Sequence, residues 1–321
     1  IPGFGDQIIQ PQSTLSITQS VLIDGYTQGD AEENSAAYPQ PLEGTVRVGI
    51  NALNGNIEVQ SHNVTIKGIS ITGSATYQII VTNSDNFVLS GSYIGVTQNG
   101  FDHFWGNGND GYYGGGVSLT SSDDARIGGI ATGDRNVIGR CGNSCVGIHG
   151  SAGNATDNVL IAGNNIGIAV DSVSPITANG LSNPAPGDGN GIQIDRYTSH
   201  IKIGDGISGV GNYLSYNTGG PLYAKDTNFL SVASNLIINN WSGYGAPIYG
   251  GGIVLEGVTT ATIGGNDSLA GNTIAGNESG SFTMRNSPDT NTPSSNISIL
   301  HNYFGVMNDH TTPFPNLIDA G

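Results

Sequence analysis

The sequence predicts an all-β protein, and within that class a right-handed parallel β-helix (a β-solenoid) with three short strands per coil. Three observations predict it: short apolar segments recur along the chain, asparagine precedes many of them, and the composition disfavours helix. Glycine supplies 51 of 321 residues, and charged residues make up only 11%. This differs from the Ala-, Leu-, Glu- and Lys-rich composition of helical proteins.

The recurring segments are three residues long, with apolar residues at the first and third positions. Examples in the first third of the chain are IEV at 57, VTI at 64, ISI at 69, IIV at 79, FVL at 87 and IGV at 94. A period of two indicates a half-buried strand, and these strands are too short and too many for a hairpin meander. Grouped in threes they form coils of about 23 to 45 residues, so we expect roughly nine or ten coils.

A longer repeat covers two coils. YIGV at 93, NIGI at 165, NLII at 235 and YFGV at 303 recur at similar intervals, as do RIGG at 126, KIGD at 202 and TIGG at 262. Asparagine tolerates the left-handed conformation of tight turns, and stacked asparagines can pair amide to amide. We therefore expect turn positions at Asn63, Asn86, Asn136, Asn158, Asn212, Asn235, Asn272 and Asn296.

These repeats resemble those of a known superfamily. GVSL…RIGG…GDRNVI…GIHG…NVLIAGNNIGI, with GGIVLEG…TIGGN…GNTIAGN, is similar to the repeats of large secreted bacterial right-handed parallel β-helix proteins of the pectate-lyase-like superfamily. The resemblance implies one β-helix domain over 1–321, with 1–50 as the N-terminal cap coil. It implies no single function, because this architecture hosts lyases, hydrolases, epimerases, adhesins and viral spikes.

Composition narrows the partners and the compartment. The formal charge of -16, with 9 basic against 25 acidic residues, disfavours nucleic acid and anionic membranes, which require clustered Lys and Arg. No apolar run approaches the ~18 residues of a membrane span. Cys141 and Cys145 lie four residues apart, which allows a local disulfide and fits an oxidising compartment. We expect a secreted or cell-surface protein.

Four long insertions, 97–115, 169–190, 239–251 and 307–316, fall between the third strand of one coil and the first strand of the next. They should project from one corner of the solenoid, which is often the binding face of a repeat protein. Their aromatic side chains either pack down onto the solenoid or form a shelf that binds a glycan or another partner. The candidate ligand-binding residues are Phe101, His103, Phe104, Trp105, Tyr112, Tyr113, Trp241, Tyr244 and Tyr249.

Calcium is the one cofactor that these insertions suggest. GNGNDG and PGDGNG supply carboxylate and carbonyl oxygens, with Asp110 and Asp188 as the candidate ligands. Neither segment has the spacing of an EF-hand loop.

The most enzyme-like pattern comes from stacking the ends of the first strands of successive coils. VGIH, IQID, LYAK, IVLE and FTMR should place one charged or titratable side chain above another about every 4.8 Å. These candidate catalytic residues are His149, Asp195, Lys225, Glu256 and Arg285. Such a column can serve a polysaccharide lyase or glycoside hydrolase, but alternating charges also describe a ladder that only stabilises the fold.

A second pattern echoes the polygalacturonases. SDD at 122, GIHG at 147 and RYTSHIK at 196 resemble their Asp-Asp, Gly-His-Gly and Arg-Ile-Lys motifs, which would make Asp123, Asp124 and His149 catalytic candidates. The Arg and Lys are too far apart in this chain, and SSDDARIGG is also explained as a turn leading into a repeated strand.

Two functions remain open. The leading hypothesis is a secreted or cell-surface structural or adhesive β-helix protein that binds glycans through its loops. PNLIDAG reads as the middle of a repeat, so we expect either that the natural protein continues or that the last coil pairs with a neighbouring molecule and assembles end to end. The alternative is a polysaccharide-active enzyme, either a lyase or a glycoside hydrolase.

Overall fold

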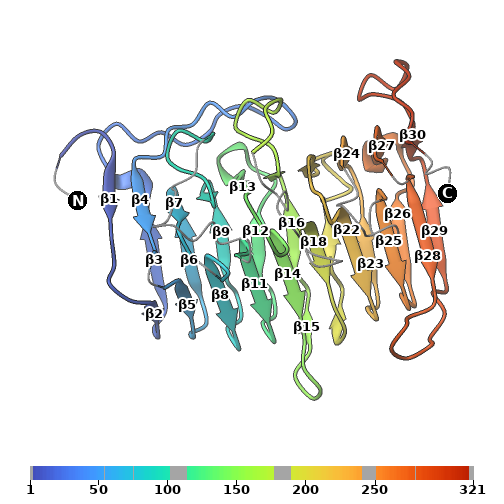
Figure 1. The fold of residues 1–321 in the computed structure, drawn as a ribbon, viewed down its shortest axis with the longest axis horizontal. Helices are drawn as coiled ribbons and strands as arrows, with labels where there is room; N and C mark the ends of the chain where they lie inside the picture. The colour runs from blue at the N-terminus through green and yellow to red at the C-terminus, as the bar shows by residue number, and fades with distance from the viewer. Residues whose placement is uncertain are drawn as a thin grey trace.

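The chain folds as a right-handed parallel β-helix built from three parallel sheets (Figure 1). The computed structural model describes residues 3–53, 55–74, 76–101, 114–176, 189–240, 251–278 and 280–317. Successive strands go to sheets A, B and C in turn, and every pairing between the strands of these sheets is parallel. The fold class predicted from the short apolar repeat is therefore confirmed.

Each sheet contains one short strand from every coil. Sheet A comprises β1 (Gln7–Ile9), β4 (Val48–Asn51), β7 (Ile69–Thr72), β10 (Tyr93–Ile94), β13 (Val137–Ile138), β17 (Asn165–Ile166), β21 (Tyr213–Leu214), β24 (Leu236–Ile238), β27 (Thr273–Ala275) and β30 (Tyr303–Phe304). Sheet B comprises β2 (Leu15–Ile17), β5 (Ile57–Val59), β8 (Ile79–Thr82), β11 (Val117–Thr120), β14 (Val146–His149), β18 (Asn190–Ile194), β22 (Gly220–Lys225), β25 (Ile253–Glu256) and β28 (Phe282–Arg285). Sheet C comprises β3 (Val21–Asp24), β6 (Val64–Lys67), β9 (Val88–Ser90), β12 (Arg126–Gly128), β16 (Leu160–Ala162), β20 (Lys202–Ile203), β23 (Leu230–Val232), β26 (Ala261–Gly264) and β29 (Ile297–Leu300).

The remaining elements are small and lie at the corners of the coils. β15 (Thr156–Asp157) and β19 (Thr198–Ser199) form a separate two-stranded sheet between sheets B and C. Three single-turn 3-10 helices follow sheet C strands or their turns: η1 (Gly25–Thr27), η2 (Thr132–Asp134) and η3 (Ser268–Ala270).

The apolar positions of the repeat fill the interior of the solenoid. In β8 and β11, for example, Ile79, Val81, Val117 and Leu119 are fully buried, and the intervening residues face outward. The same pattern in every coil builds one continuous core column. Because strands pair in register, a residue type placed at one position of successive coils forms a column that runs along the solenoid.

The expected asparagines fall into two groups with different roles. Asn63, Asn86, Asn158 and Asn296 have φ between 55 and 59° and turn the chain at the corner between sheets B and C. At the corner between sheets C and A, stacked side chains donate amide to amide, with Nδ2 to Oδ1 distances of 2.8 to 3.0 Å. This ladder contains Asn136, Asn164, Asn212, Asn235, Asn272 and Asn302.

A segment between β3 and β4, residues 28–46, crosses several coils; it is the long blue loop along the upper edge of Figure 1. The Tyr38 hydroxyl lies 3.1 Å from the Asn212 carbonyl oxygen. Arg135, only 1% exposed, donates to the carbonyl oxygens of Ala36 (3.2 Å) and Gln40 (2.7 Å). Burial lowers the pKa of Arg135 to about 10. The segment therefore ties the first coils to the middle of the solenoid.

Candidate functional site

The charged residues at the ends of the sheet B strands form one column. Ile148, Ile194 and Ala224 are successive partners in the sheet, so the residues that follow them, His149, Asp195 and Lys225, are stacked. Lys225 then pairs with Glu256, and Glu256 with Arg285. The structure thus brings together all five residues of the expected column.

The N-terminal part of the column is a histidine–carboxylate pair. His149 Nδ1 lies 3.6 Å from Asp195 Oδ2, and both side chains are about 30% exposed. The interaction with His149 is the main reason that the pKa of Asp195 is below its ordinary value. The carboxylate of Asp195 faces Nδ1 of His149, as a carboxylate faces the imidazole in acid–base sites, and the pair is accessible to solvent.

The C-terminal part of the column is a buried ion pair. Glu256 is 1% exposed, accepts a hydrogen bond of 2.5 Å from the Tyr223 hydroxyl, and pairs through Oε1 with Arg285. Both carboxylate oxygens therefore have partners inside the protein. This geometry supports the stabilising reading for Glu256 and Arg285.

Two charged residues outside the expected column, Arg196 and Asp289, complete the network, and the sequence reasoning missed Asp289. Asp289, in the connection between β28 and β29, lies 2.5 Å from Lys225 Nζ and also pairs with Arg196. The hydrogen bond from Lys225 is the first cause of the lowered pKa of Asp289. Asp289 lies 93 residues from Arg196 in a connection without strand periodicity, so no sequence pattern indicated the contact.

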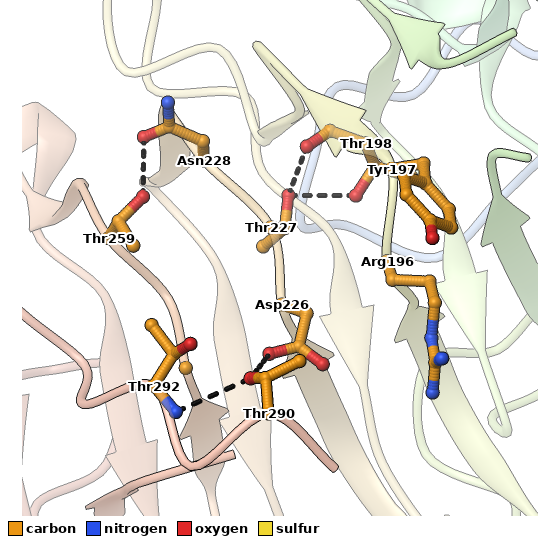
Figure 2. Close-up of a pocket in the computed structure, with 10 residues that line it drawn as sticks. Arg196, Tyr197, Thr198, Asp226, Thr227, Asn228, Thr259, Thr290 and Thr292 are labelled. Carbon is orange, nitrogen blue, oxygen red and sulfur yellow. Dashed lines mark hydrogen bonds between the residues drawn. The ribbon is translucent and has the colours of Figure 1, made fainter. Parts of the chain in front are cut away.

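Beside this network, the corner between sheets B and C contains a groove with a volume of about 280 Å³ (Figure 2). It is lined mainly by hydroxyl and amide side chains from three successive turns and from the 286–296 connection. The lining residues are Arg196, Tyr197, Thr198, Asp226, Thr227, Asn228, Gly257, Thr259, Thr290 and Thr292. We call this the threonine groove.

Hydrogen bonds between coils hold the lining of the threonine groove in place. Thr198 Oγ1 donates to Thr227 Oγ1 at 2.8 Å, and Thr259 Oγ1 donates to Asn228 Oδ1 at 2.9 Å. On the opposite side, Thr290 Oγ1 donates to Asp226 Oδ1 at 3.2 Å (Figure 2). The groove is therefore a preformed polar surface.

Exposed aromatic rings lie at and beside the threonine groove. Tyr197 and Phe229 are each 48% exposed, and Phe229 stacks on His200 with ring centroids 4.7 Å apart. All three have positive φ, between 51 and 59°. His200 and Phe229 lie just before sheet C strands, at the turn position where Asn63, Asn86, Asn158 and Asn296 also have positive φ, so the turn of the coil itself requires this conformation.

Asp123 and Asp124 lie in the turn between β11 and β12, not in the column. Asp123 Oδ1 accepts from the Asp157 N–H at 2.8 Å, and Asp124 Oδ1 accepts from Asn158 Nδ2 at 2.6 Å. Burial and neighbouring carboxylates raise the pKa of Asp123. Both residues thus make turn-to-turn hydrogen bonds, as the turn reading of SSDDARIGG expects.

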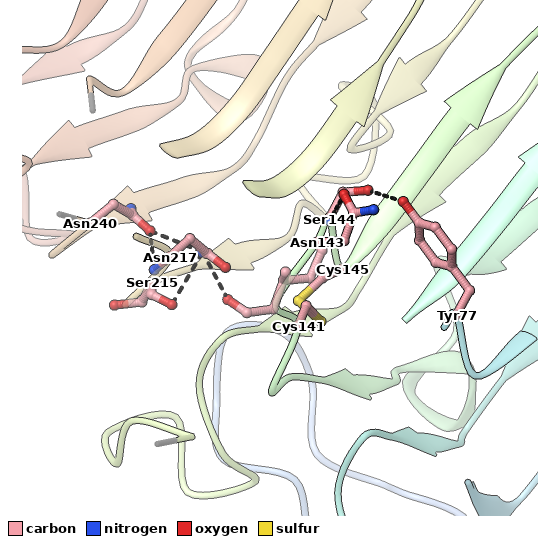
Figure 3. The surroundings of a disulfide bond; sticks show 9 residues. Tyr77, Cys141, Asn143, Ser144, Cys145, Ser215, Asn217 and Asn240 are labelled. Atoms are coloured by element: carbon pink, nitrogen blue, oxygen red, sulfur yellow. Dashed lines mark hydrogen bonds between the residues drawn. A yellow bond between two sulfur atoms is a disulfide. The ribbon is translucent and has the colours of Figure 1, made fainter. Parts of the chain in front are cut away.

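A second polar cluster, which the sequence did not indicate, lies on sheet B over Gly147. A Cβ atom at Gly147 would stand 2.9 Å from the Tyr77 hydroxyl and 3.0 Å from both Ser144 Oγ and His149 Nε2. The Tyr77 and Ser144 hydroxyls are 2.6 Å apart. Ser144 lies on the turn closed by the Cys141–Cys145 disulfide (Figure 3). The absence of a side chain at 147 lets these groups converge.

Most of the expected aromatic shelf lies outside the described residues. His103, Phe104, Trp105, Tyr112, Tyr113, Trp241, Tyr244 and Tyr249 are among these, as are the calcium candidates Asp110 and Asp188. Phe101 is described and is 44% exposed. Within the described ranges, no three His, Cys, Asp or Glu side chains are grouped so that they could hold a metal ion.

The last insertion shows how its aromatics pack. A Cβ at Gly276 would stand 2.2 Å from the Phe314 ring, and the His310 ring stacks on Tyr303 with a centroid distance of 3.6 Å. In this loop the aromatics pack onto the solenoid. The first three expected insertions connect sheet A strands to sheet B strands, and the fourth follows β30 of sheet A.

No protein-family model matches the chain, and no curated protein does. Among solved structures it is similar to an alginate lyase from Paenibacillus sp. str. FPU-7, with a TM-score of 0.38, 12% identity, and coverage of 92% of this chain and 91% of that one. It is also similar to the pectate lyase Pel9A, with a TM-score of 0.37, 11% identity, and coverage of 92% of this chain and 70% of that one. The third similar structure is the Dettilon tailspike protein, with a TM-score of 0.34, 12% identity, and coverage of 94% of this chain and 63% of that one. The fold is defined by the sheet topology of the chain itself. The described residues include no helix that is long and apolar enough to cross a membrane.

Proposed function

We propose that the protein is a secreted or cell-surface β-helix protein that binds a polysaccharide in the threonine groove and has a structural or adhesive role. The observation that carries this proposal is the groove itself, a preformed surface of hydroxyl and amide groups on successive coils. A polysaccharide presents repeated hydroxyls along one direction. A solenoid presents repeated side chains along its axis, about 4.8 Å apart. Both surfaces are therefore linear arrays of groups that donate and accept hydrogen bonds.

The aromatic rings support the same assignment. Tyr197 lines the groove, Phe229 lies on the next turn, and both rings are half-exposed. A flat apolar face with a polar edge suits the apolar face of a sugar ring. Where other coils have an asparagine at this turn, the chain has His200 and Phe229, and these rings lie beside the groove.

Binding to a polysaccharide panel, measured by affinity electrophoresis and calorimetry, tests this function. Tyr197→Asn removes the ring but keeps a residue that tolerates positive φ, so the fold should be retained while affinity falls about tenfold or more. Ile207→Ala is the control, because Ile207 is 84% exposed in the turn between β20 and β21, at the corner between sheets C and A and away from the groove. Equal effects of the two variants, or no binding to any polysaccharide, would contradict the proposal.

A second candidate function, a polysaccharide lyase or glycoside hydrolase, is favoured by one observation. His149 pairs through Nδ1 with Asp195, while its Nε2 faces the Ser144 and Tyr77 hydroxyls across Gly147. An imidazole oriented in this way can act as a general acid or base. Assays for unsaturated products and for new reducing ends on the same panel test it. Turnover that Asp195→Ala abolishes would place this function first.

End-to-end assembly is part of the same proposal. The last described coil exposes Met284 (51%), Ile299 (45%) and Phe304 (44%). A further coil stacked on this end, whether from a continuing chain or from a neighbouring molecule, would cover them and pair the edge strands. Light scattering across a concentration series tests the assembly, and particles that stay monomeric at high concentration would exclude it.

A further inference from the structure

We propose that the threonine groove selects an uncharged glycan and rejects uronate-containing chains; this inference rests on the proposed function and names its substrate class. The argument starts from the ion pairs at the border of the groove. Arg196 and Lys225, the two cations there, both pair with the single carboxylate of Asp289. Each cation is already partly neutralised by this carboxylate, so an incoming carboxylate would gain less from it than from an unpaired Arg or Lys.

The other charged groups near the groove make the balance negative. Asp226 lines the groove and accepts from Ser287 Oγ at 3.0 Å, and Asp195 interacts with His149 and Lys225. Together with Asp289, three carboxylates thus face two cations, while Glu256 and Arg285 pair with each other. A bound uronate would add negative charge to a site that already has an excess of it, in a chain of formal charge -16.

The remaining lining groups suit neutral sugar hydroxyls. A threonine hydroxyl both donates and accepts, and the Asn228 amide offers both functions as well. Recognition of an anion instead requires free Arg or Lys, in the best case a bidentate Arg fork. The chemistry of the groove therefore favours hydroxyl recognition, and binding should change little with salt because no net charge is neutralised.

The experiment compares neutral polysaccharides with polyuronates on the wild-type protein at low and high ionic strength. We expect neutral chains to bind at least tenfold more tightly, with little dependence on salt. Tighter binding of polyuronates would overturn this inference while leaving polysaccharide binding intact. Failure of every chain to bind would overturn both.

Two variants test the charge argument directly. Asp289→Asn releases Arg196 and Lys225. Asp226→Asn removes one negative charge from the groove and keeps the ion pairs of Asp289 with Arg196 and Lys225. Each should improve polyuronate binding about five- to tenfold, because one charge near the ligand is worth about 1 kcal/mol or more. Glu58→Gln makes the same change in net charge five strands away along sheet B, about 24 Å distant, beyond the Debye length of about 8 Å.

The expected control result is an unchanged polyuronate affinity for Glu58→Gln. If Asp289→Asn unfolds, which circular dichroism would show, Asp226→Asn still decides the question. No gain in a folded Asp226→Asn protein, or an equal gain in Glu58→Gln, would overturn the inference.

Discussion

Replacing Asn235 by alanine should remove the central rung of the buried asparagine ladder. Asn235 is fully buried; its Oδ1 accepts from the Asn212 N–H at 2.8 Å, and its Nδ2 donates to the Ala233 carbonyl oxygen at 2.9 Å. The variant leaves these two buried backbone groups without these partners. At about 1 to 3 kcal/mol for each such group, the free energy of unfolding should fall by about 4 kcal/mol.

The assay is urea unfolding followed by circular dichroism, with hydrogen exchange of the Asn212 amide as a local readout. Asn302→Ala is the matched control, because Asn302 ends the ladder and is only half-buried, so water can replace its bonds. We expect a loss below about 1.5 kcal/mol for the control. Losses of equal size in the two variants would refute the reasoning that burial sets the cost.

Three further predictions concern the column and the disulfide. Arg285→Met should lower the free energy of unfolding by about 3 to 5 kcal/mol, because it leaves the buried Glu256 without its counter-ion. Urea unfolding measures this loss, and a loss below about 1 kcal/mol would show that the pair does not stabilise the fold. His149 lowers the pKa of Asp195, so this pair stabilises the fold above pH about 4 and the contribution is lost as the pH falls through the lower folded-state pKa. In His149→Gln, unfolding curves at a series of pH values should show a smaller decrease of stability at acid pH. An unchanged dependence of stability on pH would contradict the stabilising role of the His149–Asp195 pair. Replacing both cysteines by serine opens a loop closed at a sequence separation of four and should lower the free energy of unfolding by about 2 kcal/mol. Thermal unfolding of the variant, and of the wild-type protein with and without reductant, measures this loss. An unchanged melting temperature in both experiments would contradict the prediction.

The sequence was sufficient to predict the column because a solenoid converts sequence period into spatial register. Once IQID and LYAK are recognised as equivalent strands, in-register pairing places Asp195 beside Lys225. The same argument predicted the stacked asparagines and the corner at which the long insertions leave the coil. These features depend on local periodicity, which a single sequence carries.

The position of Asp289 could not be predicted from sequence periodicity. It stands in an irregular connection, where no period fixes the register, yet it determines the ionic partners of both Arg196 and Lys225. The threonine groove has the same origin, since the 286–296 connection supplies one of its sides through Thr290 and Thr292. Sequence reasoning therefore placed the binding surface on the long insertions and gave no indication of this corner.

By itself, the sequence determined the three-strand coil, the apolar interior and the order of residues along each column. Strands stack in register, so residues at the same position of successive repeats must lie one above another in the solenoid. Tertiary structure alone decided which column residues are buried pairs and which face a groove. It also decided that residues 28–46 lie across distant coils, where Arg135 holds them. Irregular segments have no repeat to align them, so their positions depend on the hydrogen bonds and packing that the folded surface offers.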